Sequence, residues 1–317
     1  MALLKYILKK MLMLLPVLVG ISIIAFALGI MSPGDPVDQV LNPNGNESYT
    51  QAEYDAMAAK MGLDQPAVVQ YFNWVDGLVH GDLGRSFFTN KSVMDQLVKR
   101  IPISLKLAGF SMILTIVFGV GFGVLMAVKK DRLLDHVLGT FSTAALSVPG
   151  FWIAIVLSFL FAEQWKLLPS SGISGGSGFI LPAVTLALPS IGVCARLTRS
   201  AILDEIGRQY MTVADAKGMS RRHAVICHAF GNALIPIITY LGNHMAGIIG
   251  GASIVETIFA IPGIGSYAIV GVQSKDYYVV QAYVLFSGCI YVLTNILIDL
   301  IYIALDPKIR AGEAVES

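Results

Sequence analysis

The sequence predicts an all-α membrane protein that crosses the bilayer six times. Hydrophobic residues make up 55% of the 317 residues and charged residues only 14%, against roughly 45–50% and about 25% in a soluble domain. A helix needs about 20 apolar residues to span a bilayer, and continuous apolar runs favour helices over the alternating strands of a membrane barrel. The six candidate spans are Leu12–Met31, Leu107–Val128, Val137–Ala162, Gly178–Ala195, Ala233–Val255 and Tyr277–Ile298.

Charge and cysteine content exclude several other classes. Lys and Arg number 22 and Asp and Glu 21, a net charge of +1, so no basic field attracts nucleic acid. Cys194, Cys227 and Cys289 lie in or beside apolar stretches without C-x-x-C spacing. They are therefore expected to be free thiols rather than a disulfide framework or a metal site.

The basic residues predict that both termini are cytoplasmic. Short cytoplasmic loops are enriched in Lys and Arg, and six spans put both termini on one side. The N-terminus, the turn at Lys129–Arg132, the loop 196–232 and the C-terminal tail hold many of these residues, whereas the opposite short loops hold only Lys166 and Lys275. A cleavable signal peptide is the alternative for the first span, but its apolar run continues beyond the cleavage-like Ala25-Phe26-Ala27.

The chain is predicted to have four parts. They are a cytoplasmic N-terminus with the first span (1–31), an extracytoplasmic helical insert (32–106), a helical core of the remaining spans (107–305) with the cytoplasmic loop 196–232, and a cytoplasmic tail (306–317). The insert is either a solvated cap or a docking platform for a soluble partner, and the sequence leaves both open.

Three helices are expected within the insert. Thr50-Gln51-Ala52-Glu53 has the spacing of a capping box and Gly62 can end the helix that follows. Pro66 can start a second helix, which Gly81 would end, and Ser92 can cap a third.

Motifs along the chain resemble those of ABC importer permeases. Ala214-Asp215-Ala216-Lys217-Gly218 is similar to the EAA loop that couples such permeases to their ATPases, with Ala214 in place of the acidic first residue. The spacing to Pro236 resembles the peptide/nickel branch of the family. The other matching segments are Pro33–Pro36, Gly62–Pro66, Gly81–Gly84, His228–Ala229, Asn232–Ala233, Glu256–Phe259, Pro262–Gly265, Asp276–Tyr277, Asn295, Asp299 and Leu305–Arg310.

The resemblance implies a transport subunit rather than an enzyme. The chain has no G-x-x-x-x-G-K-[ST] segment, so it is expected to bind no cofactor, while ATP and Mg²⁺ bind to partner subunits. The implied partners are a second homologous permease, two ATPases, an extracytoplasmic substrate-binding protein and the lipid of a bacterial or archaeal inner membrane. The residues expected to meet the ATPases are Ala214, Asp215, Ala216, Lys217, Gly218, Arg221 and Arg222.

The fifth span carries candidate packing and pathway residues. Small residues four apart let helices approach closely, and here they are Gly242, Ala246, Gly247, Gly250 and Gly251. Polar side chains at membrane depth are either hydrogen-bonded packing contacts or part of a transport pathway, and the candidates are Asn243, His244 and Glu256.

The cargo is expected to be nickel or small peptides, with a slight preference for nickel. Imidazole suits nickel as a ligand, and the pattern Gly242, His244, Ile249, Gly250, Gly251 resembles the nickel subset of the family.

Two functions of other classes are weighed against the importer. A proton-coupled secondary transporter would work without ATPases. As a remote alternative, an intramembrane serine protease would pair Ser174, in Gly172-Ile173-Ser174-Gly175-Gly176, with His244. The many Gly and Ser residues of Ser170–Gly178 favour a flexible turn over a poised nucleophile.

Overall fold

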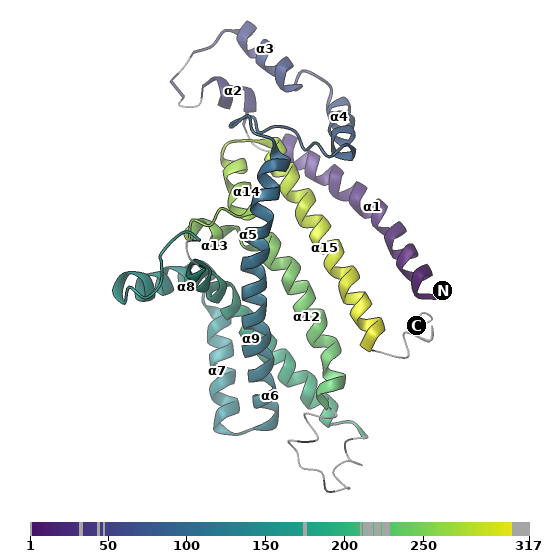
Figure 1. Cartoon of the computed structure of the whole chain (residues 1–317), viewed down its shortest axis with the longest axis vertical. Coiled ribbons are helices and arrows are strands. Elements are labelled where there is room, and N and C mark those ends of the chain that lie inside the picture. The colour runs from purple at the N-terminus through teal and green to yellow at the C-terminus, as the bar shows by residue number, and fades with distance from the viewer. Residues whose placement is uncertain are drawn as a thin grey trace. The chain divides into compact units, whose positions relative to one another are not determined.

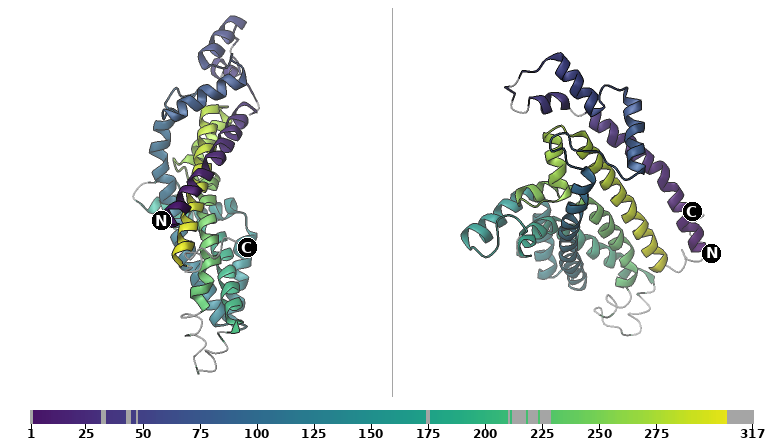
Figure 2. Two further views of the ribbon diagram at one scale, coloured as in Figure 1. Left: turned by 90° about the vertical axis from the view of Figure 1, so that its right-hand side faces the viewer. Right: turned by 45° about the horizontal axis from the view of Figure 1, so that its top comes forward.

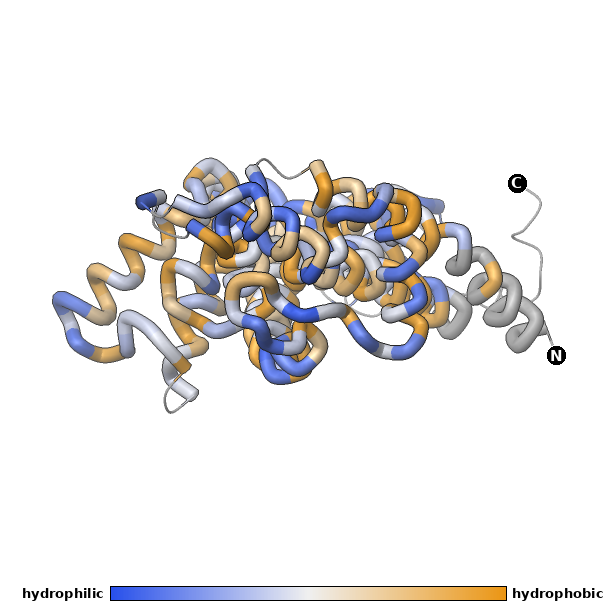
Figure 3. The backbone as a smooth tube through the Cα atoms, turned by 90° about the horizontal axis from the view of Figure 1, so that it is seen from above, coloured by the Kyte–Doolittle hydropathy of each residue, from blue (hydrophilic) through white to orange (hydrophobic). Residues whose placement is uncertain are grey.

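Every named element of the described chain is a helix. The computed structural model describes residues 2–31, 34–42, 45–46, 48–173, 176–209, 211, 218, 223 and 229–305. These form two compact units, one of Met1–Ser104 with Pro262–Val292 and one of Leu105–Ile261 with Leu293–Ser317. Figure 1 labels the helices, and Figure 3 shows the same backbone from above, coloured by hydropathy.

The first unit combines an N-terminal helix, short helices and parts of two long ones. α4 packs on α1, as Figure 2 shows. Its elements are α1 (Ala2–Met31), α2 (Pro36–Leu41), α3 (Gln51–Met61), α4 (Ala67–Val79), the first half of α5 (Val93–Leu114), α14 (Ile264–Gln273) and the first part of α15 (Tyr277–Leu305).

Local capping chemistry sets the bounds of α3, as the sequence predicts. The Thr50 side chain accepts from the Glu53 N–H, and the Glu53 carboxylate accepts from the Thr50 N–H at 2.7 Å. The Thr50 N–H and the Thr50 hydroxyl both donate to the Glu53 carboxylate, which lowers the pKa of Glu53. Gly62 ends the helix in the left-handed region, at φ 71°, which glycine adopts without steric cost. The capping box is confirmed.

The other two caps in this region are also confirmed. Pro66 precedes α4, and His80 and Gly81 follow it. The Ser92 hydroxyl accepts from the Asp95 N–H at 3.3 Å in the first turn of α5.

A buried carboxylate ties the loop after α4 to the start of α15. Asp276 is 1% exposed. Burial raises the pKa of its carboxyl, and hydrogen bonds from the Ser86 hydroxyl and from the backbone N–H groups of Phe87, Phe88 and Val279 oppose that rise. Because a buried carboxylate must be hydrogen-bonded, this anchor fixes the loop against α15.

The second unit is a bundle around α9 (Figure 1). α9 packs against η1, α6, α7, α8, α12 and α13. The elements are η1 (Thr115–Val120), α6 (Gly121–Val128), α7 (Leu133–Ser147), α8 (Gly150–Leu157), η2 (Ser158–Gln164), η3 (Ser177–Phe179), α9 (Ile180–Ile206), α12 (Phe230–Gly251) and α13 (Ser253–Ile258).

Glycines bring the neighbouring backbones close to α9. A Cβ on Gly119 would lie 2.7 Å from the Cys194 Cβ, and one on Gly123 would lie 2.6 Å from the Ala195 carbonyl oxygen. From within α9, a Cβ on Gly192 would lie 2.5 Å from the Ser142 carbonyl oxygen of α7. These distances leave no room for a larger residue. Cys194 and Cys289 are free thiols, and Cys227 lies outside the described residues.

The described chain contains four helices long and apolar enough to cross a membrane, or five if a bent pair counts as one span. The four are Val93–Val128, Ser177–Ile206, Phe230–Gly250 and Tyr277–Tyr302. Each contains most of a predicted span. The predicted first span lies within α1, of which Pro16–Met31 is a shorter apolar helix.

The predicted third span, Val137–Ala162, is not one straight helix. α7 and the α8–η2 segment are bent by 102°. Val148, which lies between them, is extended, at φ −93° and ψ 127°, and Pro149 caps α8. A residue before proline is disfavoured in the helical region, so the chain turns here within an uninterrupted apolar run.

Two predicted boundaries fall inside helices. The insert was expected to end at Lys106, yet α5 runs unbroken from Val93 to Leu114. The cytoplasmic loop was expected to begin at Arg196, yet α9 continues to Ile206. Charged residues lie within the helix in both cases, in the first part of α5 and in the last part of α9, because a helix can carry charge on an exposed face while its apolar face stays packed.

Candidate coupling and translocation site

The candidate pathway residues on α12 are held by a contact with α9. The Tyr240 hydroxyl donates to the Ser190 carbonyl oxygen at 3.2 Å. The His244 ring lies one turn further on and stacks on the Tyr240 ring, with centroids 5.6 Å apart and planes 5° apart. The tyrosine therefore positions the imidazole.

The three candidates differ in exposure. Asn243 is exposed and His244 is half-buried. The His244 Nε2 is itself buried and has no hydrogen-bond partner among the described residues. Glu256 lies on α13 and is fully buried. An imidazole nitrogen left unpaired is costly in an apolar surrounding, so His244 is the strongest pathway candidate of the three.

No metal-ligand set surrounds His244 in the described part of the chain. No group of three or more His, Cys, Asp or Glu side chains lies together there as metal ligands would. Nickel sites draw on several nitrogen, oxygen or sulfur ligands, so His244 by itself does not define one.

The small residues of α12 that are predicted to pack against other helices fall into two groups. Gly242 abuts Ile298 of α15, whose Cδ1 and Cγ1 a Cβ would overlap, and Ala246 is buried. Gly247 and Gly250 have no atom within 4 Å of an added Cβ. The N-terminal half of the stripe thus packs within this chain, while these two glycines leave an open helix face. Gly251 is the last residue of α12.

Most of the predicted coupling residues lie outside the described part of the chain. They are Ala214, Asp215, Ala216, Lys217, Arg221 and Arg222, and the neighbouring His228 lies outside it too. Gly218 is described and has a φ of +76°, a conformation that glycine adopts without the strain of a side chain.

Buried residues on either side of this segment belong to one hydrophobic cluster. Met211 is 2% exposed and Ala229 is 0% exposed, and both pack with Ile202 of α9 and Ile237 of α12. Because packed cores deform little, a displacement of the segment between Met211 and Ala229 would be passed to both helices.

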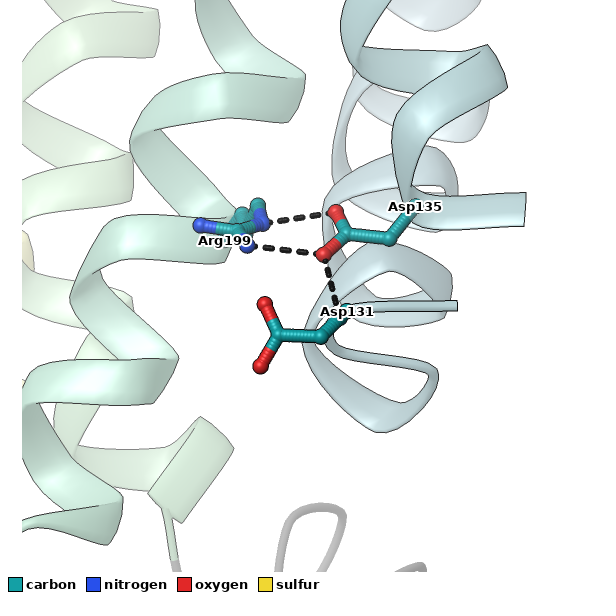
Figure 4. Close-up of polar contacts among 3 residues, drawn as sticks. All are labelled: Asp131, Asp135 and Arg199. Atoms are coloured by element: carbon teal, nitrogen blue, oxygen red, sulfur yellow. Dashed lines mark hydrogen bonds and ion pairs between the residues drawn. The ribbon is translucent and has the colours of Figure 1, made fainter. Parts of the chain in front are cut away.

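An ion pair that the sequence analysis missed fastens α7 to α9 (Figure 4). Arg199 Nε donates to Asp135 Oδ1 and Nη2 donates to Oδ2, both at 2.7 Å. The Asp131 backbone N–H donates to the same Oδ2 at 2.9 Å. The Asp135 side chain is only 4% exposed, so these hydrogen bonds are what stabilises its buried negative charge.

Comparison with known proteins identifies the family. Residues 119–311 match the family described as binding-protein-dependent transport system inner membrane component, and residues 3–108 match its N-terminal counterpart. The chain belongs to the dipeptide/oligopeptide family of ABC importer permeases. It is therefore a multi-pass membrane protein and a transport component rather than an enzyme.

The similar permeases match over almost their whole length. The probable peptide ABC transporter permease protein y4tP of Sinorhizobium fredii is 36% identical and covers 96% of this chain and 99% of its own. The dipeptide transport system permease protein DppB of Escherichia coli K12 is 33% identical and covers 97% of this chain and 99% of its own.

Two solved structures share the fold of the permease at low sequence identity. The MetNI methionine ABC transporter, in inward-facing conformations, matches with a TM-score of 0.57 at 17% identity and covers 67% of this chain and 97% of its own. An amino acid ABC transporter with histidines matches with a TM-score of 0.52 at 17% identity and covers 65% and 92%. These likenesses support the helical fold alone.

Arg199→Ala is expected to destabilise the permease by about 3–5 kcal/mol, because it leaves the Asp135 carboxylate buried without its partner. Arg196→Ala, one turn earlier on α9 at an exposed position, is the matched control and should stay within about 0.5 kcal/mol. SDS-induced unfolding of the purified chain measures both. Equal stability of the two variants would show that the ion pair does not hold α7 to α9.

Proposed function

We propose that this chain is a membrane-spanning subunit of an ATP-driven, binding-protein-dependent importer of dipeptides and other short peptides. The observation that carries the proposal is the match over nearly the whole chain to proteins named as peptide and dipeptide permeases. Alternating access would bring the cargo into the cytoplasm as spans rotate or slide as rigid bodies.

We propose a six-span topology with both termini cytoplasmic, in the inner membrane of a bacterium or archaeon. α1 supplies the first span and the bent α7–α8 pair the third. The assignment is supported by the long apolar helices and by the distribution of Lys and Arg among the short loops.

The proposed partners are a second homologous permease, two ATPases and an extracytoplasmic binding protein. In this arrangement ATP and Mg²⁺ bind to the ATPases and this chain binds no cofactor. The insert 32–106 docks the loaded binding protein, and cargo passes through the core 107–305. The tail 306–317 lies in the cytoplasm.

We propose that the segment Ala214–Gly218, with Arg221 and Arg222, contacts the ATPases. The buried Met211 and Ala229 support this, because they join the flanks of the segment to the cores of α9 and α12. Closure of the ATPases would then move these helices together. The open glycines of α12, Gly247 and Gly250, are proposed to meet the second permease.

The comparisons do not support the preference for nickel. The similar permeases are named for peptides and dipeptides, and His244 has no set of metal ligands among the described residues. His244 and Asn243 are therefore proposed to line a peptide pathway, and Glu256, buried on α13, is proposed as a further pathway residue. A secondary transporter and a protease are not favoured by the family, and Ser174 lies outside the described residues.

Deleting Ala214–Gly218 is expected to abolish co-purification of the ATPases with the permease, since the deletion removes the proposed contact. Deletion of Asn42–Asn46, of equal length but in the insert, is the control and should leave co-purification of the ATPases unchanged. Affinity purification of the complete importer measures both. Retention of the ATPases on the shortened loop would refute the coupling assignment.

Proteoliposomes containing the complete importer and its binding protein are expected to take up a radiolabelled dipeptide when ATP is supplied to the ATPases. The variant His244→Gln should keep this uptake, because a glutamine side chain also offers an acceptor and a donor to a peptide. Uptake of ⁶³Ni²⁺ is measured in parallel. ATP-dependent nickel uptake that His244→Gln abolishes, without any dipeptide uptake, would overturn the peptide assignment.

A further inference from the structure

The helix α4 differs from the other short helices of the insert in the side chains that it exposes. In α2 and α3, whose residues are all described, no large hydrophobic side chain is exposed, whereas α4 exposes four. They are Val68, Val69, Phe72 and Val79, of which Phe72 is 64% exposed and Val79 is 78% exposed. A helix of a water-filled loop has no reason to expose such residues together, so α4 calls for a separate explanation.

The exposed side chains of α4 form one apolar stripe. Residues three, four, seven or eleven positions apart share a face of a helix, because each turn takes about 3.6 residues. Val68 precedes Phe72 by four positions and Val79 by eleven. The half-buried Val75 falls on the same face, between Phe72 and Val79. A contiguous apolar stripe of this kind marks a contact with another apolar surface.

The two faces beside the stripe have different surroundings. On one side, Tyr71 and Trp74 contact α1. On the other side, Asn73 and Asp76 are polar and exposed, and the Asp76 side chain is 78% exposed. Around its axis, α4 therefore has a face on α1, then an apolar exposed face, and then a polar exposed face.

Side-chain contacts fix where α4 lies along α1 (Figure 2). The Ser22 hydroxyl donates to the Val19 carbonyl oxygen at 2.8 Å and lies 2.9 Å from the Tyr71 hydroxyl, from which it accepts. The Phe26 ring lies 5.3 Å from the Tyr71 ring, measured between centroids. It also lies 6.1 Å from the Trp74 ring. These contacts hold α4 beside the second half of α1.

The same turns of α1 expose apolar side chains. Ser22 lies in the second half of the apolar run Leu12–Met31. At about 1.5 Å per residue, it is about 13 Å from the end of that run. Ile23, Ile24 and Leu28 are exposed on these turns, as is expected of a span that faces acyl chains. The part of α1 that holds α4 is therefore one that lipid surrounds.

The charge of α4 favours an apolar contact over an electrostatic one. Asp76 is the one charged residue of the helix, which contains no Lys or Arg. Helices that bind anionic headgroups by charge are rich in Lys and Arg. Tyr71 has the amphipathic ring that is typical of membrane interfaces. A soluble protein would approach from the aqueous side, where α4 presents Asn73 and Asp76 instead of the apolar stripe.

We propose that α4 is an interfacial helix whose apolar stripe lies among the lipids of the outer leaflet. Amphipathic helices of this kind bury their apolar face about 5–10 Å into the boundary between headgroups and acyl chains. The insert 32–106 is then not wholly outside the membrane, and α2 and α3 remain in water for the binding protein. The inference rests on the proposed topology, which makes α1 a span and places α4 on the outer side.

Nitroxide labels on the full chain in lipid nanodiscs test the proposal. Single cysteines are introduced as Phe72→Cys and, as the matched control four residues later on the polar face, Asp76→Cys. The native Cys194, Cys227 and Cys289 are replaced by Ala, and SDS-induced unfolding shows that each variant is folded. Saturation measurements by electron paramagnetic resonance compare collisions with oxygen, which concentrates in acyl chains, and with water-soluble chromium oxalate. The Phe72→Cys label should collide mainly with oxygen and the Asp76→Cys label mainly with chromium oxalate.

A charge placed on the stripe tests whether the stripe holds the helix in lipid. A carboxylate is costly among acyl chains, so Phe72→Asp should lower the oxygen collisions of a label at Val79→Cys. Asn73→Asp makes a carboxylate on the polar face and should leave them unchanged. Because α4 has no Lys or Arg, nanodiscs of phosphatidylcholine, with or without phosphatidylglycerol, should give the same result.

Three results would overturn the proposal. Equal collisions of the Phe72→Cys and Asp76→Cys labels with chromium oxalate would put the stripe in water. Loss of oxygen collisions at Phe72→Cys, when the second permease or the binding protein is added, would assign the stripe to that protein. A requirement for phosphatidylglycerol would show that charge, rather than the apolar stripe, holds the helix at the membrane.

A label on α1 separates this inference from the proposed topology. Leu28→Cys in lipid with Phe72→Cys in water contradicts the interfacial helix and leaves the first span standing. Chromium oxalate collisions at both positions contradict the first span itself. Both faces of a nanodisc are open to the reagents, so a reversed topology would leave the pattern unchanged and would contradict only the choice of leaflet.

Discussion

The close approach of backbones around α9 is the constraint on which the second unit depends. In lipid, apolar side chains gain little by leaving their surroundings, so helices associate through van der Waals packing and interhelical hydrogen bonds. Gly119 and Gly123 meet α9 from one neighbouring segment, and Gly192 meets α7 from within it. The Arg199–Asp135 pair then fixes the register of α7. One helix thereby organises most of the unit.

This packing connects the fold to the proposed transport cycle. Met211 and Ala229, on the two sides of the proposed coupling segment, share a buried cluster with Ala127 of α6, Ile202 of α9 and Ile237 of α12. Because packed interiors transmit displacement rather than absorb it, a push on the coupling segment would move these helices as a body. The reaction of ATP on the ATPases would then be linked mechanically to the passage of cargo through this chain.

The sequence predicts those features that depend on neighbouring residues. The capping box at Thr50 and the positive φ of Gly62 involve a few adjacent positions. A hydropathy pattern does not predict the 102° bend before α8, because the residues are apolar on both sides of the bend. The Asp135–Arg199 pair joins residues 64 positions apart. The Ser92 cap predicts where α5 starts, but charges such as Arg100, which lies 4.6 Å from the Tyr267 ring, hid the continuation of this helix into the second predicted span.

Two glycines of α6 test the central claim most directly. Each should gain up to about 1 kcal/mol in helix propensity on replacement by Ala. Gly121 has no atom within 4 Å of an added Cβ, whereas a Cβ on Gly123 would lie 2.6 Å from the Ala195 carbonyl oxygen. SDS-induced unfolding should show Gly121→Ala neutral or stabilised and Gly123→Ala destabilised by about 1–3 kcal/mol. Equal stability of the two variants would contradict the account.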